Sequence, residues 1–354
     1  MKRYIKSFED SEAIQNAVYN GELSKPYVAY NEDENVIDWN SITPLSEIPL
    51  TFEILGDGDI VWWTSDSSAT RTIEYSINGG EWTEITSTTE DGILINVNSG
   101  DTVQFRGDNQ SYATSNNSFN TFGSSVNFKA KGNIMSLINS TNFSTLDSIP
   151  SNWCFSRLFS NSIRLTDAKN LLLPATTLAS RCYCDMFAYC SSLTQAPSIL
   201  PATTLAMYCY YNMFKGCTSL TTAPELPATT LAMYCYNYMF FGCTSLTTAP
   251  ELPATTLADA CYQYMFDGCS SLTSAPSLPV TTLVNRCYNS MFNGCRSLNY
   301  IKCLATNISA SSCTGTWVRN VAPTGTFVKN PNMNDWTTGI NGIPNGWTVV
   351  DAEL

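Results

Sequence analysis

The second half of the chain is built from a short unit repeated in tandem, and this repeat limits the fold more than any other feature. Each copy carries the sequence Leu-Pro-Ala-Thr-Thr-Leu-Ala or a close variant, and successive prolines lie 27, 26, 26 and 26 residues apart. These prolines are Pro174, Pro201, Pro227, Pro253 and Pro279. A unit this short cannot bury its own apolar side chains, so we expect the copies to stack and share one core.

Every complete copy contains two cysteines, and the second always lies eight residues after the first. The first set is Cys182, Cys209, Cys235, Cys261 and Cys287, and the second is Cys190, Cys217, Cys243, Cys269 and Cys295. Stacking places each cysteine beside its counterpart, so we predict two ladders of buried, reduced thiols. A disulfide within a copy is the alternative, and it requires Cα atoms within about 7 Å. The spacing is not that of a zinc site, and the chain has no histidine.

Within a copy, Ser-Leu-Thr-Thr-Ala-Pro is expected to form a short strand. The Met-Tyr-Cys-Tyr-x-x-Met-Phe stretch is expected to form a helical turn. The helical turn would end at a glycine, such as Gly216, where positive φ is favourable. A period between 20 and 29 residues is typical of leucine-rich repeats. The pattern therefore predicts a mainly β solenoid with short helical turns over residues 132–304. Residues 305–354 break the period, and we expect an irregular cap there, sealed by Trp317, Trp336 and Trp347.

The first part of the chain has a different organisation. Apolar and polar residues alternate in short runs separated by turn sequences, which predicts a β-sandwich of the immunoglobulin type over residues 46–131. The predicted strands are Leu50–Leu55, Ile60–Thr64, Thr72–Ser76, Trp82–Ile85, Ile93–Val97 and Thr102–Phe105, and residues 111–125 are predicted to be a long loop. Residues 1–45 are predicted to be a separate anchor segment, with a short helix from Asp10 or Ser11 to Gly21 and strands at Tyr27–Tyr30 and Val36–Trp39.

The elements Met-Phe-x-Gly-Cys-Thr-Ser-Leu-Thr-Thr-Ala-Pro and Leu-Pro-Ala-Thr-Thr-Leu-Ala resemble the BspA-like leucine-rich-repeat family over residues 150–304. The resemblance implies a surface-exposed protein used for adhesion and recognition, of a kind found in gut Bacteroidales and their phages. The N-terminal phrase Gly-Glu-Leu-Ser-Lys-Pro-Tyr-Val-Ala-Tyr resembles the N-terminal segment of virion or fibre proteins of Bacteroidales (crAss-like) phages.

Composition argues against several classes of function. The net charge is −12, with 18 basic and 30 acidic residues, so neither nucleic acid nor an anionic membrane surface is an expected partner. No apolar run is long enough to span a bilayer. The absence of histidine removes the commonest general base and the Ser-His-Asp and Cys-His sites. We therefore expect a protein without catalytic residues, cofactor or metal ligands.

A pair of glutamates and an Arg-Gly-Asp tripeptide could each have a function, but the repeat and the strand pattern account for both equally well. Glu225 and Glu251 occupy the same position in adjacent copies. Stacking alone would bring them to about 5 Å, the separation of a retaining glycosidase pair. The tripeptide Arg106-Gly107-Asp108 spells a cell-attachment motif, but it stands where a predicted strand ends in a turn.

A repeated band of tyrosines is the best candidate for a recognition surface. Half of these side chains are expected to pack between copies, and the others to stack on sugars or meet a protein partner. With the two glutamates, the candidate surface comprises Tyr208, Tyr210, Tyr234, Tyr236, Glu225 and Glu251.

The expected function is that of a non-enzymatic virion surface protein of a phage, in a head or tail fibre. It would be assembled in the host cytoplasm without a secretion signal and anchored to other virion proteins through its N-terminal segment. Its solenoid would bind a host surface glycan or protein, and a homotrimer would suit a fibre. The alternatives are a bacterial cell-surface adhesin and, third, a glycan-degrading spike.

Overall fold

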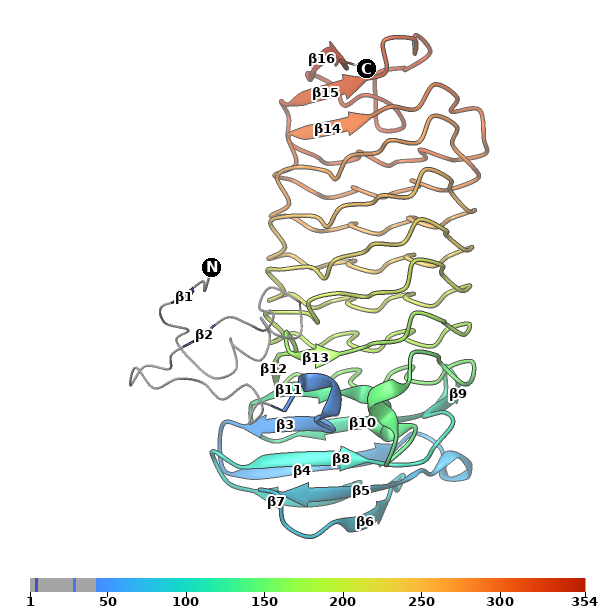
Figure 1. Cartoon of the computed structure of the whole chain (residues 1–354). Helices are drawn as coiled ribbons and strands as arrows, with labels where there is room; N and C mark the ends of the chain where they lie inside the picture. Colours follow the sequence, from blue (N-terminus) through green and yellow to red (C-terminus); the bar gives the residue numbers. More distant parts are fainter. Residues whose placement is uncertain (1–3, 6–27, 30–42, 354) are drawn as a thin grey trace.

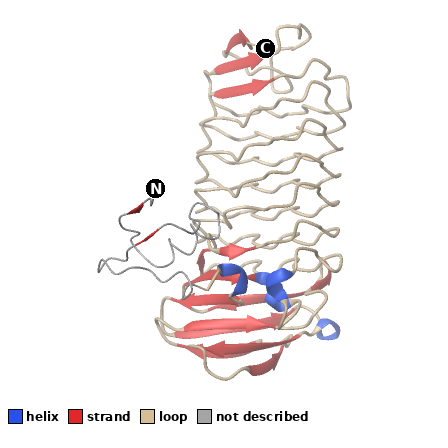
Figure 2. Cartoon of the chain, viewed as in Figure 1, coloured by secondary structure: helices blue, strands red, loops and turns tan. Residues whose placement is uncertain are grey.

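The computed structural model describes residues 4–5, 28–29 and 43–353, and residues 43–353 form a tall column of stacked coils on a broader base of β-strands (Figure 1). The described residues are mainly β, and their only helices are short 3-10 segments. Figure 2 shows that the strands gather in the base and at the C-terminal end. The helix predicted to begin at Asp10 or Ser11 and end at Gly21, and the strand predicted at Val36–Trp39, lie outside the described residues. Near the N-terminus, β1 (Tyr4–Ile5) pairs in parallel with β2 (Val28–Ala29).

Two sheets form the base, and aromatic side chains pack between them. One sheet has the order β7-β4-β10-β9, and the other has the order β12-β11-β3-β8-β5-β6. The strands contributed by the base are β3 (Leu50–Ile54), β4 (Gly58–Thr64), β5 (Thr72–Ile77), β6 (Thr83–Thr86), β7 (Ile93–Val97), β8 (Thr102–Arg106), β9 (Ala113–Ser115), β10 (Ser118–Ser124) and β11 (Phe128–Asn133). Phe122 of β10 meets Phe52 of β3 and Phe105 of β8 at ring-centroid distances of 5.1 and 4.8 Å. In β4, buried residues alternate with partly buried ones, which gives this strand its inward face.

The six strands predicted in the base are all present, but the loop predicted at residues 111–125 is wrong. This stretch forms β9 and β10, joined by a turn at Asn116 and Asn117. Its polar sequence is compatible with a strand because the buried polar side chains find partners. Asn120 donates to the carbonyl oxygens of Ala69 (2.8 Å) and Tyr112 (3.1 Å) and accepts from Ser87 Oγ (2.6 Å).

Strand β11 connects the base to the stacked copies. It pairs antiparallel with β3 on one side and parallel with β12 (Leu165–Asp167) and β13 (Leu171–Leu172) on the other. The boundary predicted between residues 131 and 132 therefore falls inside a strand shared by both parts. The buried side chains form one continuous cluster from the base to the C-terminal end.

Successive copies lie parallel to one another, with equivalent residues one above the next. The phenylalanines Phe159, Phe187, Phe214, Phe240, Phe266 and Phe292 form one column, with neighbouring ring centroids 5.3 to 5.8 Å apart and planes within 7°. The predicted strand in each copy is reduced to single parallel bridges such as Thr248↔Ser274. The proline of the Ala-Pro step has no N–H to extend such a ladder.

The predicted helical turn is wrong, because this stretch is a chain of β-turns. In the copy at 207–232, Cys209, Tyr211 and Met213 each donate their amide to the carbonyl three residues earlier. The amides in between donate to the next copy, as Tyr210 N does to Cys235 O at 3.0 Å. Every fourth residue has positive φ, including Tyr208 at 58° and Gly216 at 73°. Positive φ at the third position is typical of type II turns, so the glycine is the third residue of a turn, Phe214 to Cys217, rather than the end of a helix.

The C-terminal region is more regular than the predicted irregular cap. Strands β14 (Tyr300–Cys303), β15 (Thr326–Lys329) and β16 (Thr348–Asp351) pair in parallel and extend the stack beyond residue 304. The indole of Trp317 lies 6.2 Å from the Tyr288 ring and 6.3 Å from the Phe292 ring, so it covers the end of both internal aromatic columns. Trp336 stacks on its other side at 5.6 Å.

Candidate recognition surface

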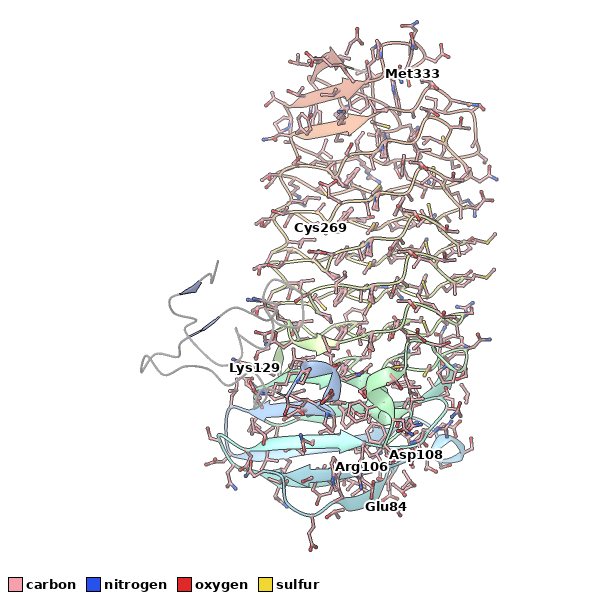
Figure 3. All side chains as sticks on the ribbon, in the orientation of Figure 1. Glu84, Arg106, Asp108, Lys129, Cys269 and Met333 are labelled. Atoms are coloured by element: carbon pink, nitrogen blue, oxygen red, sulfur yellow. The ribbon has the colours of Figure 1, made fainter. Side chains whose placement is uncertain are left out.

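The two sets of cysteines lie in two internal columns, and all fourteen thiols of the chain are free and buried. Figure 3 shows Cys269 within the stack. In the second set, each thiol donates to the carbonyl of the phenylalanine one copy earlier. Cys217 Sγ lies 3.0 Å from Phe187 O, and Cys243 Sγ lies 3.1 Å from Phe214 O. The same carbonyl also accepts the amide of its own turn, so both of its lone pairs are used.

Thiols of the first set pack as apolar groups among the tyrosine rings. Burial raises the pKa of Cys235 to about 12. Burial raises the pKa of Cys154 well above its usual value, and burial together with the Asp185 carboxylate raises the pKa of Cys184. These are the opposite conditions from those that generate a reactive thiolate. Within the described part of the chain, no group of three or more acidic, cysteine or histidine side chains is arranged to hold a metal ion.

The four tyrosines of the predicted surface separate into two pairs. Tyr210 and Tyr236 are buried and stack with equivalent residues in an internal column, at 5.7 Å from one another. They are therefore removed from the recognition surface, because their side chains point inward between the cysteines. Tyr208 and Tyr234 are half-buried on the outside and stack with ring centroids 4.7 Å apart.

These outer tyrosines belong to a column that we call the stacked column, comprising Trp153, Arg181, Tyr208 and Tyr234. The Arg181 guanidinium carbon lies 4.9 Å from the Trp153 ring centroid and 3.9 Å from that of Tyr208. All four side chains are half-buried, so their edges reach solvent. The column thus presents the edges of three rings and one cation in a row.

A second group of outward side chains continues this surface, and we call it the tyrosine cluster. It comprises Tyr189, Tyr211, Lys215, Tyr238, Phe241 and Tyr264. Tyr211 joins the two groups, since its ring lies 5.6 Å from Tyr208 and 6.1 Å from Tyr238. The Lys215 ammonium lies 5.3 Å from the Tyr238 ring, 5.4 Å from Phe241 and 5.9 Å from Tyr189. Together, the stacked column and the tyrosine cluster form the aromatic face.

The aromatic face is confined to part of the stack. In the copies that follow, the positions of Tyr234 and Phe241 are taken by Ala260 and Asp267, while the internal phenylalanine and cysteines continue unchanged. The aromatic residues of the outer positions are therefore not required to stack the copies. Sequence reasoning missed Trp153, Arg181 and Lys215, because a helical turn gave no means of telling which residues of each copy point outward.

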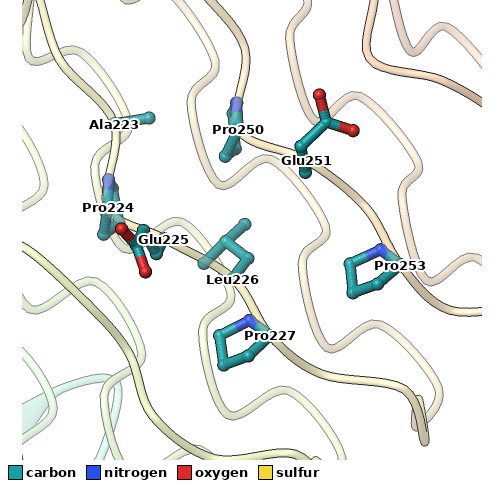
Figure 4. A pocket seen from close by; sticks show the side chains of 8 residues that line it. All are labelled: Ala223, Pro224, Glu225, Leu226, Pro227, Pro250, Glu251 and Pro253. Carbon is teal, nitrogen blue, oxygen red and sulfur yellow. The ribbon is translucent and has the colours of Figure 1, made fainter.

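The predicted glutamate pair lines an open groove of about 410 Å³ (Figure 4). Its other lining residues are Ala223, Pro224, Leu226, Pro227, Pro250 and Pro253. Glu225 and Glu251 are both exposed, and their carboxylates point away from each other in Figure 4. Neither has the desolvated environment of a glycosidase general acid.

The Arg106-Gly107-Asp108 tripeptide lies in the base, where Figure 3 labels its two charged residues. Arg106 ends β8, pairs with Glu74 at 2.6 Å and lies 4.1 Å from the Trp82 ring centroid. The Asp108 carboxylate accepts from the amide and hydroxyl of Ser140 at 2.9 and 3.0 Å. Both charged side chains are engaged within the fold.

No model of a protein family, no curated protein and no solved structure matches this chain. Among the residues that the structure describes, no helix has the length and apolar character that a membrane span requires.

Proposed function

We propose that this chain is a non-enzymatic surface protein of a phage virion, in a head or tail fibre, whose repeats bind the surface of the host cell. In this proposal the stacked copies are a leucine-rich-repeat solenoid, and the base is an immunoglobulin-like β-sandwich. The N-terminal segment anchors the chain to other virion proteins. The parallel register of successive copies supports the solenoid, and the resemblance of the N-terminal sequence supports the virion location.

The observation that carries the proposal is the aromatic face. Exposed aromatic residues offer large contact area at low entropy cost, and they are typical of surfaces that bind sugars or proteins. Here they are contiguous across several copies, at positions where stacking does not demand them. A solenoid presents such positions as an extended surface, and multiple copies on one particle would add avidity.

The binding role is tested by adding fluorescently labelled full-length protein to intact bacterial cells and measuring decoration by flow cytometry. We expect replacement of Tyr238 and Tyr264 by alanine to reduce decoration about tenfold or more, since each ring contact contributes on the order of 1 kcal/mol. Tyr300→Ala is the matched control, because Tyr300 is 38% exposed and lies outside the aromatic face. Equal decoration by both variants would contradict the proposed surface.

The virion location is tested by mass spectrometry of purified particles. The protein is expected among the structural components, and its absence from them would refute this part of the proposal. Recovery in the cell envelope of bacteria instead would favour the alternative, a cell-surface adhesin.

A further inference from the structure

We propose that the ligand of the aromatic face is an acidic saccharide, and that Arg181 receives its carboxylate. This inference rests on the proposed binding function and adds the chemical class of the ligand. It follows from how the two cations of the face are held.

Arg181 is a positioned guanidinium without an anionic partner. Its guanidinium carbon lies 4.9 Å from the ring centroid of Trp153 and 3.9 Å from that of Tyr208. In the described part of the chain, its side chain makes no ion pair and donates no hydrogen bond to another residue. Arg106 and Arg157 also lie against rings, but they pair with Glu74 at 2.6 Å and with Asp185 at 3.8 Å. The two ring contacts hold the guanidinium in place and leave its N–H groups without a partner among the described residues, so they are available to bind a carboxylate through two hydrogen bonds.

Lys215 supplies a second positive charge nearby. It lies among the rings of Tyr189, Tyr238 and Phe241, and it too lacks an ion pair within the described residues. Two acidic side chains near the aromatic face are hydrogen-bonded to other residues. Asp185 accepts from Asn212 at 2.9 Å, and at the far end of the face Asp267 accepts from Asn293 at 2.9 Å. In a chain of net charge −12, the aromatic face thus carries two basic side chains that form no ion pair with a described residue.

The same surface disfavours an acidic peptide as the ligand. A peptide strand would need free backbone amides, but those of this segment bond alternately within their own turn and to the next copy. What remains outward are ring surfaces, hydroxyls and two cations. Burial, with the neighbouring Tyr264, raises the pKa of Tyr238 to about 12, so its hydroxyl stays neutral. Rings that stack on sugars and cations that bind carboxylates together fit an acidic saccharide.

The test measures binding of the full-length protein to immobilised glycans that contain uronic or sialic acids and to neutral glycans. We expect binding to the acidic set, weakening as NaCl rises. Arg181→Gln should lower affinity for the acidic glycans about tenfold or more, and Arg181→Lys should restore it only in part, because lysine keeps the charge and loses the fork. Glutamine and lysine are both long side chains like arginine, so we expect both variants to fold, and thermal unfolding checks this.

Arg296→Gln is the charge-matched control, because Arg296 is exposed and lies outside the aromatic face. Equal losses in Arg181→Gln and Arg296→Gln would overturn the inference, as would equal affinity for neutral and acidic glycans. Cell decoration without binding to any acidic glycan would also overturn it, leaving the binding function intact. Failure to decorate any cell and to bind any glycan would refute both.

Discussion

At the scale of the residue, the two cysteine columns have different physical roles. Thiols of the second set fill a buried site and also donate to a phenylalanine carbonyl one copy earlier, as Cys269 does to Phe240 at 3.1 Å. Thiols of the first set, such as Cys235, are buried beside tyrosine rings, and among the described residues only Cys287 of this set donates a hydrogen bond, a long one of 3.9 Å to Cys313 O. A small donor suits the first environment, and a small apolar group suits the second.

Replacing a cysteine by serine should therefore have a different effect on stability in each of the two columns. In Cys243→Ser the hydroxyl can donate to Phe214 O in place of the thiol, so we expect a loss of unfolding free energy under about 1 kcal/mol. In Cys235→Ser the hydroxyl is buried without that partner, so we expect a loss of about 1–3 kcal/mol. Urea denaturation of both variants measures the difference. A larger loss in Cys243→Ser than in Cys235→Ser would contradict the assigned roles.

At the scale of the element, the turns have room for a side chain at a glycine position, whereas β11 has none. Gly242 and Gly132 both have positive φ, at 73° and 78°. A Cβ on Gly242 would meet only the Cα of Gly216, at 4.0 Å, whereas a Cβ on Gly132 would lie 2.2 Å from the carbonyl oxygen of Pro49. The strand that connects the base to the copies thus requires the absence of a side chain.

We expect Gly242→Ala to destabilise the protein by about 1 kcal/mol, the usual cost of a left-handed conformation for a residue with a Cβ. Gly132→Ala adds a clash with backbone and should lower the unfolding free energy by several kcal/mol, on the order of 3 or more. Chemical denaturation compares the two variants directly. Similar losses in both would show that β11 tolerates a side chain at this junction.

The elements also show what the sequence could and could not predict. The 26-residue spacing fixes which residues share a column, so the stacked cysteines and phenylalanines follow from it. The chain of turns could not be predicted, because Tyr208 and Asn212, four residues apart, have positive φ although neither is a glycine. This four-residue period resembles the spacing along a helix. Arg181 and Tyr208 are 27 residues apart in the sequence. Their contact could be predicted only if it were known which residues of each copy point outward.

At the scale of the whole molecule, the buried thiols make stability depend on alkaline pH. Burial raises the pKa of Cys182, Cys190, Cys235, Cys287 and Cys303 to about 12, against 9.0 for an unperturbed thiol. Above about pH 9 the unfolded chain releases these protons while the folded chain retains them, so stability falls as pH rises.

The unfolding free energy should therefore be steady up to about pH 8 and then decrease, with a slope that approaches about 1.4 kcal/mol per pH unit for each such thiol as the pH rises above 9. Urea denaturation at intervals from pH 7 to pH 10 measures the slope. Cys235→Ala should be less stable at neutral pH. Above about pH 9, however, its unfolding free energy should fall less steeply with pH, because one thiol that releases a proton on unfolding has been removed. An unchanged slope in this variant would contradict the linkage.

The turn bonds between copies all run in one direction. Amides of one copy donate to carbonyls of the following copy throughout, from Phe155 N to Cys182 O through Tyr288 N to Cys313 O. Aligned peptide dipoles add along an axis, as they do in a helix. The column of turns thus has aligned peptide groups, with carbonyl oxygens directed toward the base and amide hydrogens toward the C-terminal end. The chain itself satisfies the groups left over at each end of this column: Tyr112 N donates to Cys154 O at one end, and Asn341 Oδ1 accepts from Thr316 N at the other.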